Sequence, residues 1–247
     1  MTWSIVARAP DGAFGVAVAS RFFAVGALCP HAKSGLGALS TQALMNPAYG
    51  PAGIDLLAQG YESRHVIDEL IAGDPGRESR QVHAIDAQGR VAAHTGSQCI
   101  EWCGHLAGDG FSIAGNMLAG PQVLAETARA YSANSQLDFA LRLIVAMEAG
   151  EAAGGDKRGK QAAALRIVTT EVYPVLDLRV DDHAEPLAEL RRLYDRSLER
   201  YQPFIACLPS RANAAGITDR AVIEREIERF HARRTAVAPP ATAPGRG

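Results

Sequence analysis

Alternation of polar and apolar positions predicts that the chain opens with a β-hairpin. Residues 3–8 alternate between two faces in steps of two, which is typical of a strand with one face buried. A Pro-Asp-Gly turn at 10–12 leads into a second strand of small and β-branched residues at 15–20. Because the turn sets the strand register, we expect Thr2 at the open end of the hairpin, beside the residues that follow the second strand.

Strands and helix pairs alternate along the rest of the chain. The expected elements are two short strands within 21–43, helices at 51–59 and from Ser63 (as N-cap) to the turn at 73–76, a hairpin of 81–86 and 90–95, a loop at 99–110, a strand at 110–116, helices at 121–132 and 136–149, strands at 162–168 and 172–180, and helices at 187–201 and 219–233. This order departs from the strict strand-helix alternation of a parallel doubly wound sheet. It predicts an α+β fold, a four-layer αββα sandwich of two antiparallel sheets.

The expected domain organisation is one large domain with a helical extension. Residues 1–205 form the αββα domain and residues 206–235 the extension. Residues 236–247 are rich in Pro, Ala and Gly and are expected to be a disordered tail. The Glu- and Arg-rich run at 220–234 is interpreted as a solvated helix or as a surface that packs on a partner subunit.

Composition narrows the classes of partner. The chain has 247 residues, of which 47% are hydrophobic and 21% charged, which is ordinary for a globular protein. Its net charge of −2 argues against a nucleic-acid partner, because binding phosphates needs a basic excess. No targeting signal and no membrane-length apolar run is visible, so a cytoplasmic protein without a membrane partner is expected.

The four cysteines predict neither a disulfide scaffold nor a metal site. They are too few and too scattered for a scaffold. Cys99, Cys103 and His105 suggest zinc, but a second ligand pair with matching spacing is missing, so small buried thiols are the favoured interpretation. No metal and no cofactor is therefore predicted.

Thr2 is the first candidate for chemistry. A Thr hydroxyl is a weak nucleophile until a base removes its proton, and the α-amine of an N-terminal Thr can be that base. The pKa of an α-amine is about 8, so much of the amine is neutral and can accept a proton at working pH. Removal of Met1 would give Thr2 both a hydroxyl and a free α-amine. The alternative is that Thr2 has no catalytic role and simply follows the initiator Met. Ser4 is a second candidate hydroxyl, but it would become N-terminal only if the chain were cleaved after Trp3.

Several separated motifs resemble the DUF1028 family, a bacterial family of uncharacterised function placed among the N-terminal nucleophile (Ntn) hydrolase folds. The motifs are residues 1–8, 15–26, 41–47, 50–51 and 154–161. The resemblance implies the same αββα sandwich and no defined substrate.

A more distant likeness is to proteasome-type β subunits. In that pattern a nucleophilic Thr is followed by an Asp-Ser-Arg tripeptide and a catalytic Lys, which Thr2, Ser20-Arg21 and Lys33 match here. Ala19 stands where the pattern has Asp, so another group replaces that carboxylate or the chain is not such a hydrolase.

Further side chains complete the expected site. Backbone N–H groups and Asn116 are the candidate oxyanion donors, and Lys33 is a candidate catalytic cation unless it only extends into solvent at a strand edge. Arg21 is expected to bind a substrate carboxylate or to lower the pKa of the Thr2 amine, unless it pairs with a structural carboxylate. The remaining candidates, Asp156, Lys157 and Gln161, lie in a glycine-rich loop that either faces the substrate or is a surface turn.

Two functions follow from these residues. The first is an Ntn-type amidohydrolase that cleaves a C–N bond in a small amide, ureido or short peptide compound. The alternative is a non-catalytic Ntn-like protein that binds a ligand or assembles with other chains. In either case we expect a homo-oligomer.

Overall fold

The computed structural model describes residues 2–237 and divides into two units. The first unit is Met1–Tyr194 and the second is Asp195–Gly247. The division falls within one helix, α5 (Pro186–Glu199), and therefore earlier than the domain boundary expected at residue 205.

The first unit contains two antiparallel sheets. Within its described residues, six strands follow the order β10-β9-β2-β1-β8-β7 and four follow the order β3-β4-β5-β6. The strands are β1 (Thr2–Arg8), β2 (Phe14–Ser20), β3 (Pro30–Lys33), β4 (Gly37–Ala43), β5 (Arg80–Asp86), β6 (Val91–Thr95), β7 (Gly104–Gly108), β8 (Phe111–Asn116), β9 (Ala162–Val168) and β10 (Leu176–Val180). β1 lies between β2 and β8, so its first residue has a strand partner on each side.

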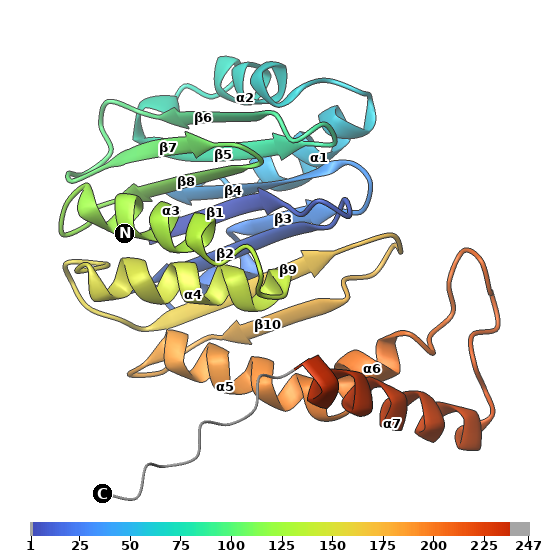
Figure 1. Ribbon diagram of the computed structural model, residues 1–247. Helices are drawn as coiled ribbons and strands as arrows, with labels where there is room; N and C mark the ends of the chain where they lie inside the picture. Colours follow the sequence, from blue (N-terminus) through green and yellow to red (C-terminus); the bar gives the residue numbers. More distant parts are fainter. Residues whose placement is uncertain (1, 238–247) are drawn as a thin grey trace, which may run out of the picture. The chain divides into compact units, whose positions relative to one another are not determined.

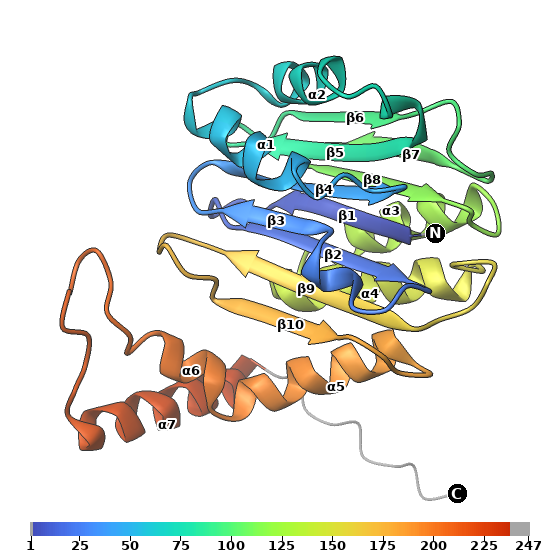
Figure 2. The ribbon, with the colours of Figure 1, turned by 180° about the vertical axis from the view of Figure 1, so that it is seen from behind.

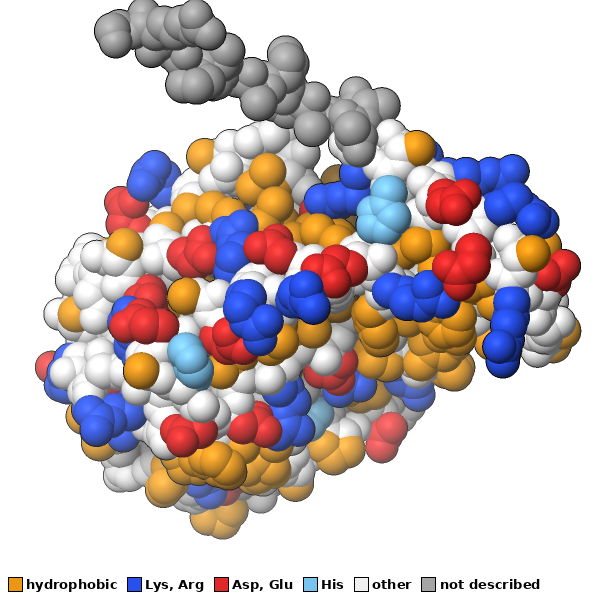
Figure 3. Space-filling model, turned by 90° about the horizontal axis from the view of Figure 1, so that it is seen from below, with side chains coloured by type: hydrophobic (Ala, Val, Ile, Leu, Met, Phe, Trp, Pro, Cys, Tyr) orange, Lys and Arg blue, Asp and Glu red, His pale blue; other side chains and the backbone are white. Residues whose placement is uncertain are grey.

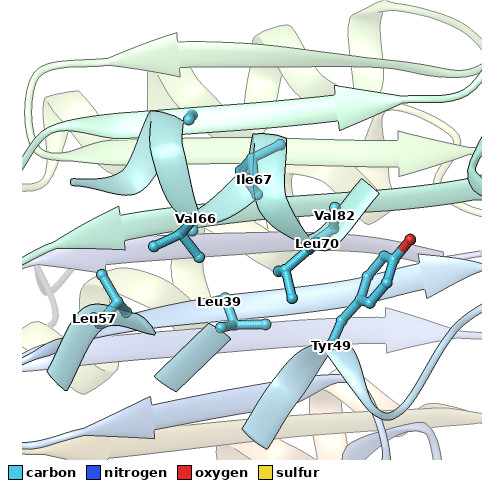
Figure 4. Close-up of a cluster of buried hydrophobic side chains, with 9 residues drawn as sticks. Leu39, Tyr49, Leu57, Val66, Ile67, Leu70 and Val82 are labelled. Atoms are coloured by element: carbon cyan, nitrogen blue, oxygen red, sulfur yellow. The ribbon is translucent and has the colours of Figure 1, made fainter. Parts of the chain in front are cut away.

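Helix pairs cover the outer faces of both sheets, which confirms the predicted αββα order. α3 (Gln122–Ala133) and α4 (Phe139–Ala152) cover the six-stranded sheet (Figure 1). α1 (Tyr49–Ala58) and α2 (Ser63–Ala72) cover the four-stranded sheet (Figure 2). Their apolar side chains pack on that sheet (Figure 4), in a cluster that includes Leu39, Tyr49, Leu57, Val66, Ile67, Leu70 and Val82.

The space between the sheets is apolar in one half and polar in the other. The apolar half consists of Val6, Phe14, Val16, Ala38, Ile85 and Val168. The polar half consists of the buried side chains of Thr2, Ser4, Gln42, Gln81, His83, Ser112 and Asn116. Burying polar groups is unfavourable unless they are hydrogen-bonded. Packing alone does not explain so many buried polar side chains, so this half of the core is the candidate location of a functional site.

The segment 99–110, expected to be a loop, contains strand β7. It pairs with β8 across a turn at Asp109 and Gly110, where Gly110 has a φ of 70°. An Asp-Gly pair favours a tight hairpin because it tolerates this left-handed backbone. Two glycines bound the short strand and obscure its alternation, which explains why the prediction of a loop was wrong.

The start of α2 also differs from the expectation. Ser63 is the first residue of the helix, and the N-cap position is Glu62, whose side chain makes no capping hydrogen bond. Instead, the Ser63 N–H donates to Asp86 Oδ2 at 3.1 Å. The free N–H at the helix start is therefore satisfied by a carboxylate at the end of a neighbouring strand.

The bounds of the last elements of the chain differ from the prediction. β10 begins at Leu176 rather than at 172. The helix expected over 187–201 is two helices, α5 and α6 (Tyr201–Ile205). Pro203 lies within α6 and cannot supply a backbone N–H to a continuous long helix.

The second unit carries α7 (Arg220–Val237), the charged helix expected from the sequence. Arg200 pairs with Glu224 at 2.6 Å, and Arg229 pairs with Glu226 at 2.6 Å. Basic and acidic side chains are intermixed on the face that Figure 3 shows. Apart from its first two residues, which belong to α7, the predicted disordered tail at 236–247 lies outside the described residues.

None of the helices found between residues 2 and 237 has both the length and the apolar character needed to cross a bilayer.

Candidate functional site

Thr2 lies at one end of the sandwich, where several strands begin or end together. Its register partners are Ser20, the last residue of β2, and Asn116, the last residue of β8. The Thr2 hydroxyl donates to Ser20 Oγ at 3.1 Å, and Thr2 is only 3% exposed. We call this end, with the last residues of β2, β4 and β8 and the first of β1 and β5, the Thr2 end.

Two amide side chains contact the Thr2 carbonyl from inside the sandwich, and a third amide, Gln81, holds both of them. Gln42 Nε2 and Asn116 Nδ2 each lie 3.4 Å from the Thr2 carbonyl oxygen. Both amides also donate to Gln81 Oε1, at 2.8 and 3.1 Å. Gln81 thus fixes the two donors that approach Thr2.

Deeper between the sheets, His83 joins two serines. Ser4 Oγ donates to Gln42 Oε1 at 2.6 Å and lies 2.8 Å from His83 Nε2. Since the Ser4 hydroxyl has one proton, His83 Nε2–H donates to Ser4, and His83 Nδ1 accepts from Ser112 Oγ at 3.1 Å. Burial, with a smaller contribution from the charge of His105, lowers the pKa of His83 to about 3, so the ring is neutral near pH 7.

This neutral histidine predicts a pH-dependent stability. Its pKa is lower in the folded chain than the ordinary 6.5, so the unfolded chain binds more protons once the pH falls below about 6.5. The free energy of unfolding should then fall by up to about 1.4 kcal/mol per pH unit on acidification. Denaturant unfolding of the wild type and of His83→Gln between pH 7 and 5 measures this, and equal slopes would contradict it.

A glycine-rich loop at residues 154–160 connects the strand ends around Thr2. The Arg21 N–H donates to Asp156 Oδ2 at 2.9 Å, next to Ser20. Ala119 N–H donates to the carbonyl oxygen of Gly155 at 3.1 Å, beyond the end of β8. Lys157 Nζ donates to the Glu101 carbonyl at 2.7 Å. The loop therefore contacts segments that follow β2, β6 and β8.

Two pockets lie beside the strand partners of Thr2. One, of ≈ 130 Å³, is lined by residues that include Trp3, Ala19, Ser20 and Asp156. The other, of ≈ 260 Å³, is lined by residues that include Asn116. We call the first the Ser20 pocket and the second the Asn116 pocket.

The expected site residues divide into those near Thr2 and those elsewhere. Asn116 lies beside Thr2, and Arg21 and Asp156 lie beside its strand partner Ser20. Gln161 directly precedes Ala162, the other strand partner of Ser20, and its side chain donates to Asp182 Oδ1 at 3.1 Å.

Lys33 is not brought to Thr2. It is exposed and pairs with Gly37 at the far end of β4, whereas Gln42, near the other end of that strand, is the residue that contacts Thr2. Roughly 16 Å of strand separates Gly37 from Gln42. The position of Lys33 in the sequence suggested that it lies close to Thr2, but the register of β3 on β4 places it at the opposite end of β4.

The cysteines of the 99–105 segment are free thiols. Cys99 donates to the Arg80 carbonyl at 3.3 Å, and Cys103 donates to the Cys99 carbonyl at 3.4 Å. Burial raises the pKa of Cys99 to about 11, which keeps this thiol protonated at neutral pH. In the part of the chain that the structure describes, no three His, Cys, Asp or Glu side chains form a group able to hold a metal ion.

Sequence reasoning missed Gln81 and His83 as members of this region. Both occupy inward positions of β5, two residues apart, and both are fully buried. Polar residues at consecutive inward positions of an otherwise apolar strand were the available signal. The sequence did not show which residues Gln81 and His83 contact, because their hydrogen bonds to Asn116 and Ser4 form only when the two sheets stack.

Comparisons with known proteins identify the family and one similar structure. A family model described as "Family of unknown function (DUF1028)" matches residues 2–190. The crystal structure of protein SPO2555 from Silicibacter pomeroyi, assigned to the DUF1028 family model, has a TM-score of 0.82 at 29% identity and covers 88% of this chain and 96% of its own.

A weaker likeness is to Anbu, an ancestral β-subunit from Yersinia bercovieri. It has a TM-score of 0.36 at 13% identity and covers 79% of this chain and 94% of its own, and it supports no conclusion about this chain. No curated protein matches the sequence. Because the family model spans most of the sequence, from the first strand to α5, the chain belongs to the DUF1028 family.

Proposed function

We propose that the protein is an Ntn-type amidohydrolase that cleaves a C–N bond in a small amide, ureido or short peptide compound. The observation that carries the proposal is Thr2 itself. Thr2 carries a hydroxyl and, once Met1 is removed, an α-amine, and it begins strand β1 between Ser20 and Asn116. Each of these two strand partners lines a pocket. Proximity of nucleophile and base is what a weak hydroxyl nucleophile needs.

The reaction would proceed in two steps after removal of Met1. Thr2 Oγ1 attacks the amide carbonyl carbon, and the Thr2 α-amine takes the hydroxyl proton. The C–N bond breaks as the amine passes that proton to the leaving nitrogen, which leaves an ester on Thr2. Water, deprotonated by the same amine, attacks the ester carbonyl carbon. The bond from that carbon to Thr2 Oγ1 breaks, the amine returns the proton to Oγ1, and the acid is released.

Asn116 is the proposed donor to the oxyanion. Its Nδ2 contact to the Thr2 carbonyl is long, at 3.4 Å, compared with ordinary N–H···O bonds of about 2.7 to 3.2 Å. A developing oxyanion would attract this proton more strongly than a neutral carbonyl does. Gln81 would hold the amide in place for that purpose.

Arg21 and Lys157 are the proposed contacts for a substrate carboxylate. Lys157 Nζ donates to a backbone carbonyl, and the Arg21 guanidinium contacts the carbonyl of Arg158. Both side chains are exposed to solvent, so each can still bind an anion. The carboxylate missing at Ala19 would be replaced by Asp156, which binds the backbone of the neighbouring Arg21.

The proposal requires a free α-amine on Thr2, and intact mass measures it. We expect purified protein, expressed without an N-terminal tag, to lack the mass of Met1. An acetylated terminus or a retained Met1 would remove the base and contradict the mechanism. A Thr2→Leu variant is the control, because bulky residues after Met1 should block its removal.

The alternative, a non-catalytic ligand-binding or assembly protein of the same fold, is favoured by one observation. Position 19 is a buried Ala that aligns with Trp3 in the ladder, so no carboxylate stands there beside Thr2. This alternative predicts that ligand binding persists when Thr2 loses its hydroxyl and that no amide is cleaved.

A further inference from the structure

The Asn116 pocket differs from the rest of the Thr2 end in that its lining is uncharged. The side chains that line it come from the end of β4, the loop before β7 and the end of β8: Ala43, Leu44, Cys99, Ile100, Asn116 and Met117, with Ser79 and Gln98 beside them. An uncharged lining solvates an ionised group poorly and favours an apolar one. The chemistry of its walls therefore selects for neutral ligands.

Two large apolar side chains at this pocket are open to solvent. Leu44 is 68% exposed and Ile100 is 59% exposed. Covering such side chains with a ligand removes apolar surface from water, which favours binding. Their backbones are fixed nonetheless, because Leu44 N–H donates to Ser79 O at 3.1 Å and Ile100 O accepts from Met117 N–H at 2.8 Å.

Unusual backbone conformations occur on both sides of the same pocket. Ala43 has a φ of 67° and Met117 a φ of 53°, both in the left-handed region that non-glycine residues seldom adopt. Each directly follows a side chain that contacts the Thr2 carbonyl, Gln42 or Asn116. Strained residues that cluster in this way are typical of functional sites.

We infer that the Asn116 pocket binds an uncharged, apolar acyl substituent of the amide that Thr2 cleaves. The inference rests on the proposed function. Asn116 belongs both to the pocket and to the contacts of Thr2, so a substrate carbonyl held between Thr2 and Asn116 lies at the edge of this pocket, which its acyl substituent can enter. The acyl part stays bound to Thr2 as the ester, so a pocket lined by Asn116, a strand partner of Thr2, would hold it through both steps.

The volume of ≈ 260 Å³ suits a short chain or a single ring rather than a segment of protein. Arg21 and Lys157, in contrast, would bind a charged group outside this pocket. The substrate class is therefore an amide with a small apolar acyl part.

Binding of acetamide, butanamide and hexanamide to the Thr2→Ala variant tests the inference without turnover. We expect affinity, measured by NMR titration, to rise about fourfold for each methylene buried. Succinamate, which carries a charge on a chain of similar length, should show no such gain once Arg21 and Lys157 are also replaced by Ala. Equal affinity for acetamide and hexanamide, or a gain for succinamate in that background, would overturn the inference.

Variants of the pocket locate the effect. Ile100→Asp and Leu44→Asp, each in the Thr2→Ala background, should abolish the chain-length dependence, and Ile100→Ser should weaken it. Val172, 86% exposed between β9 and β10, gives the matched control Val172→Asp, which should leave the dependence unchanged. Persistence of the dependence in Ile100→Asp would also overturn the inference.

The same compounds distinguish this inference from the proposed function. Chain-length-dependent binding to Thr2→Ala with no hydrolysis of hexanamide by the wild type would refute the amidohydrolase and retain the apolar ligand site. Hydrolysis with equal efficiency for all three amides would support the amidohydrolase and refute the apolar pocket.

Discussion

Replacing Thr2 by alanine is expected to reduce amide hydrolysis by at least about a thousandfold. The change removes the only atom proposed to attack the carbonyl, Thr2 Oγ1, and it leaves strand β1 and its register with Ser20 and Asn116 in place. Thr2→Ser keeps both the hydroxyl and the α-amine and should retain most of the activity. Initial rates with short-chain amides, after confirmation of N-terminal processing by intact mass, measure the effect.

Thr41→Ala is the matched control for this experiment. Thr41 is another fully buried threonine near the same end, and its hydroxyl donates to the Asn46 carbonyl rather than to a group around Thr2. It should lose stability without a comparable loss of rate. Similar rate losses in both variants would show a structural effect, and unchanged hydrolysis by Thr2→Ala would reject Thr2 as the nucleophile.

The pH dependence of the same rate identifies the base. If the α-amine of Thr2 accepts the proton, kcat/KM should rise about tenfold for each unit by which the pH increases. The rise should level off at a pH of about 8, the ordinary pKa of an α-amine. The buried His83, whose pKa is about 3, would be neutral throughout that range and cannot produce this rise. A rate that is constant between pH 6 and 9 would contradict the amine as base.

The layers of the fold could be predicted from the sequence because they depend on local patterns. Alternation over residues 3–8 and 15–20 identified the central hairpin, and the order of strands and helix pairs predicted the αββα sandwich. β7 was missed because glycines at both ends weaken its pattern. The capping of Ser63 was missed because its partner, Asp86, is distant in sequence.

The candidate site was predictable only where strand pairing alone determines it. Thr2, Arg21 and Asn116 meet at one end of the sandwich because β1, β2 and β8 are neighbours in one sheet. Lys33 was misplaced because its distance from Thr2 depends on the register of β3 in the other sheet. The hydrogen bonds of His83 and Gln81 depend on how the two sheets stack, which no periodicity along the chain reports.

Gln81→Leu is expected to lower the free energy of unfolding by roughly 3 to 5 kcal/mol. The Gln81 amide accepts from Gln42 and Asn116, and its two N–H protons are shared among Thr95 Oγ1 and the carbonyls of Gly104 and Gly115, at 2.8 to 3.1 Å. A leucine of similar size leaves several of these buried partners without a hydrogen bond, at about 1 to 3 kcal/mol each. Urea unfolding measures the loss.

Gln136→Leu is the matched control, since Gln136 is exposed and the same exchange there should change stability by less than about 0.5 kcal/mol. Gln81→Glu tests the direction of the hydrogen bonds separately. A carboxylate can accept from Gln42 and Asn116, but it cannot donate to the two glycine carbonyls, so it should also be destabilising. A Gln81→Leu protein as stable as the wild type would contradict this prediction. It would show that the amide contacts around Thr2 contribute little to folding, so that only function would explain the buried polar half of the core.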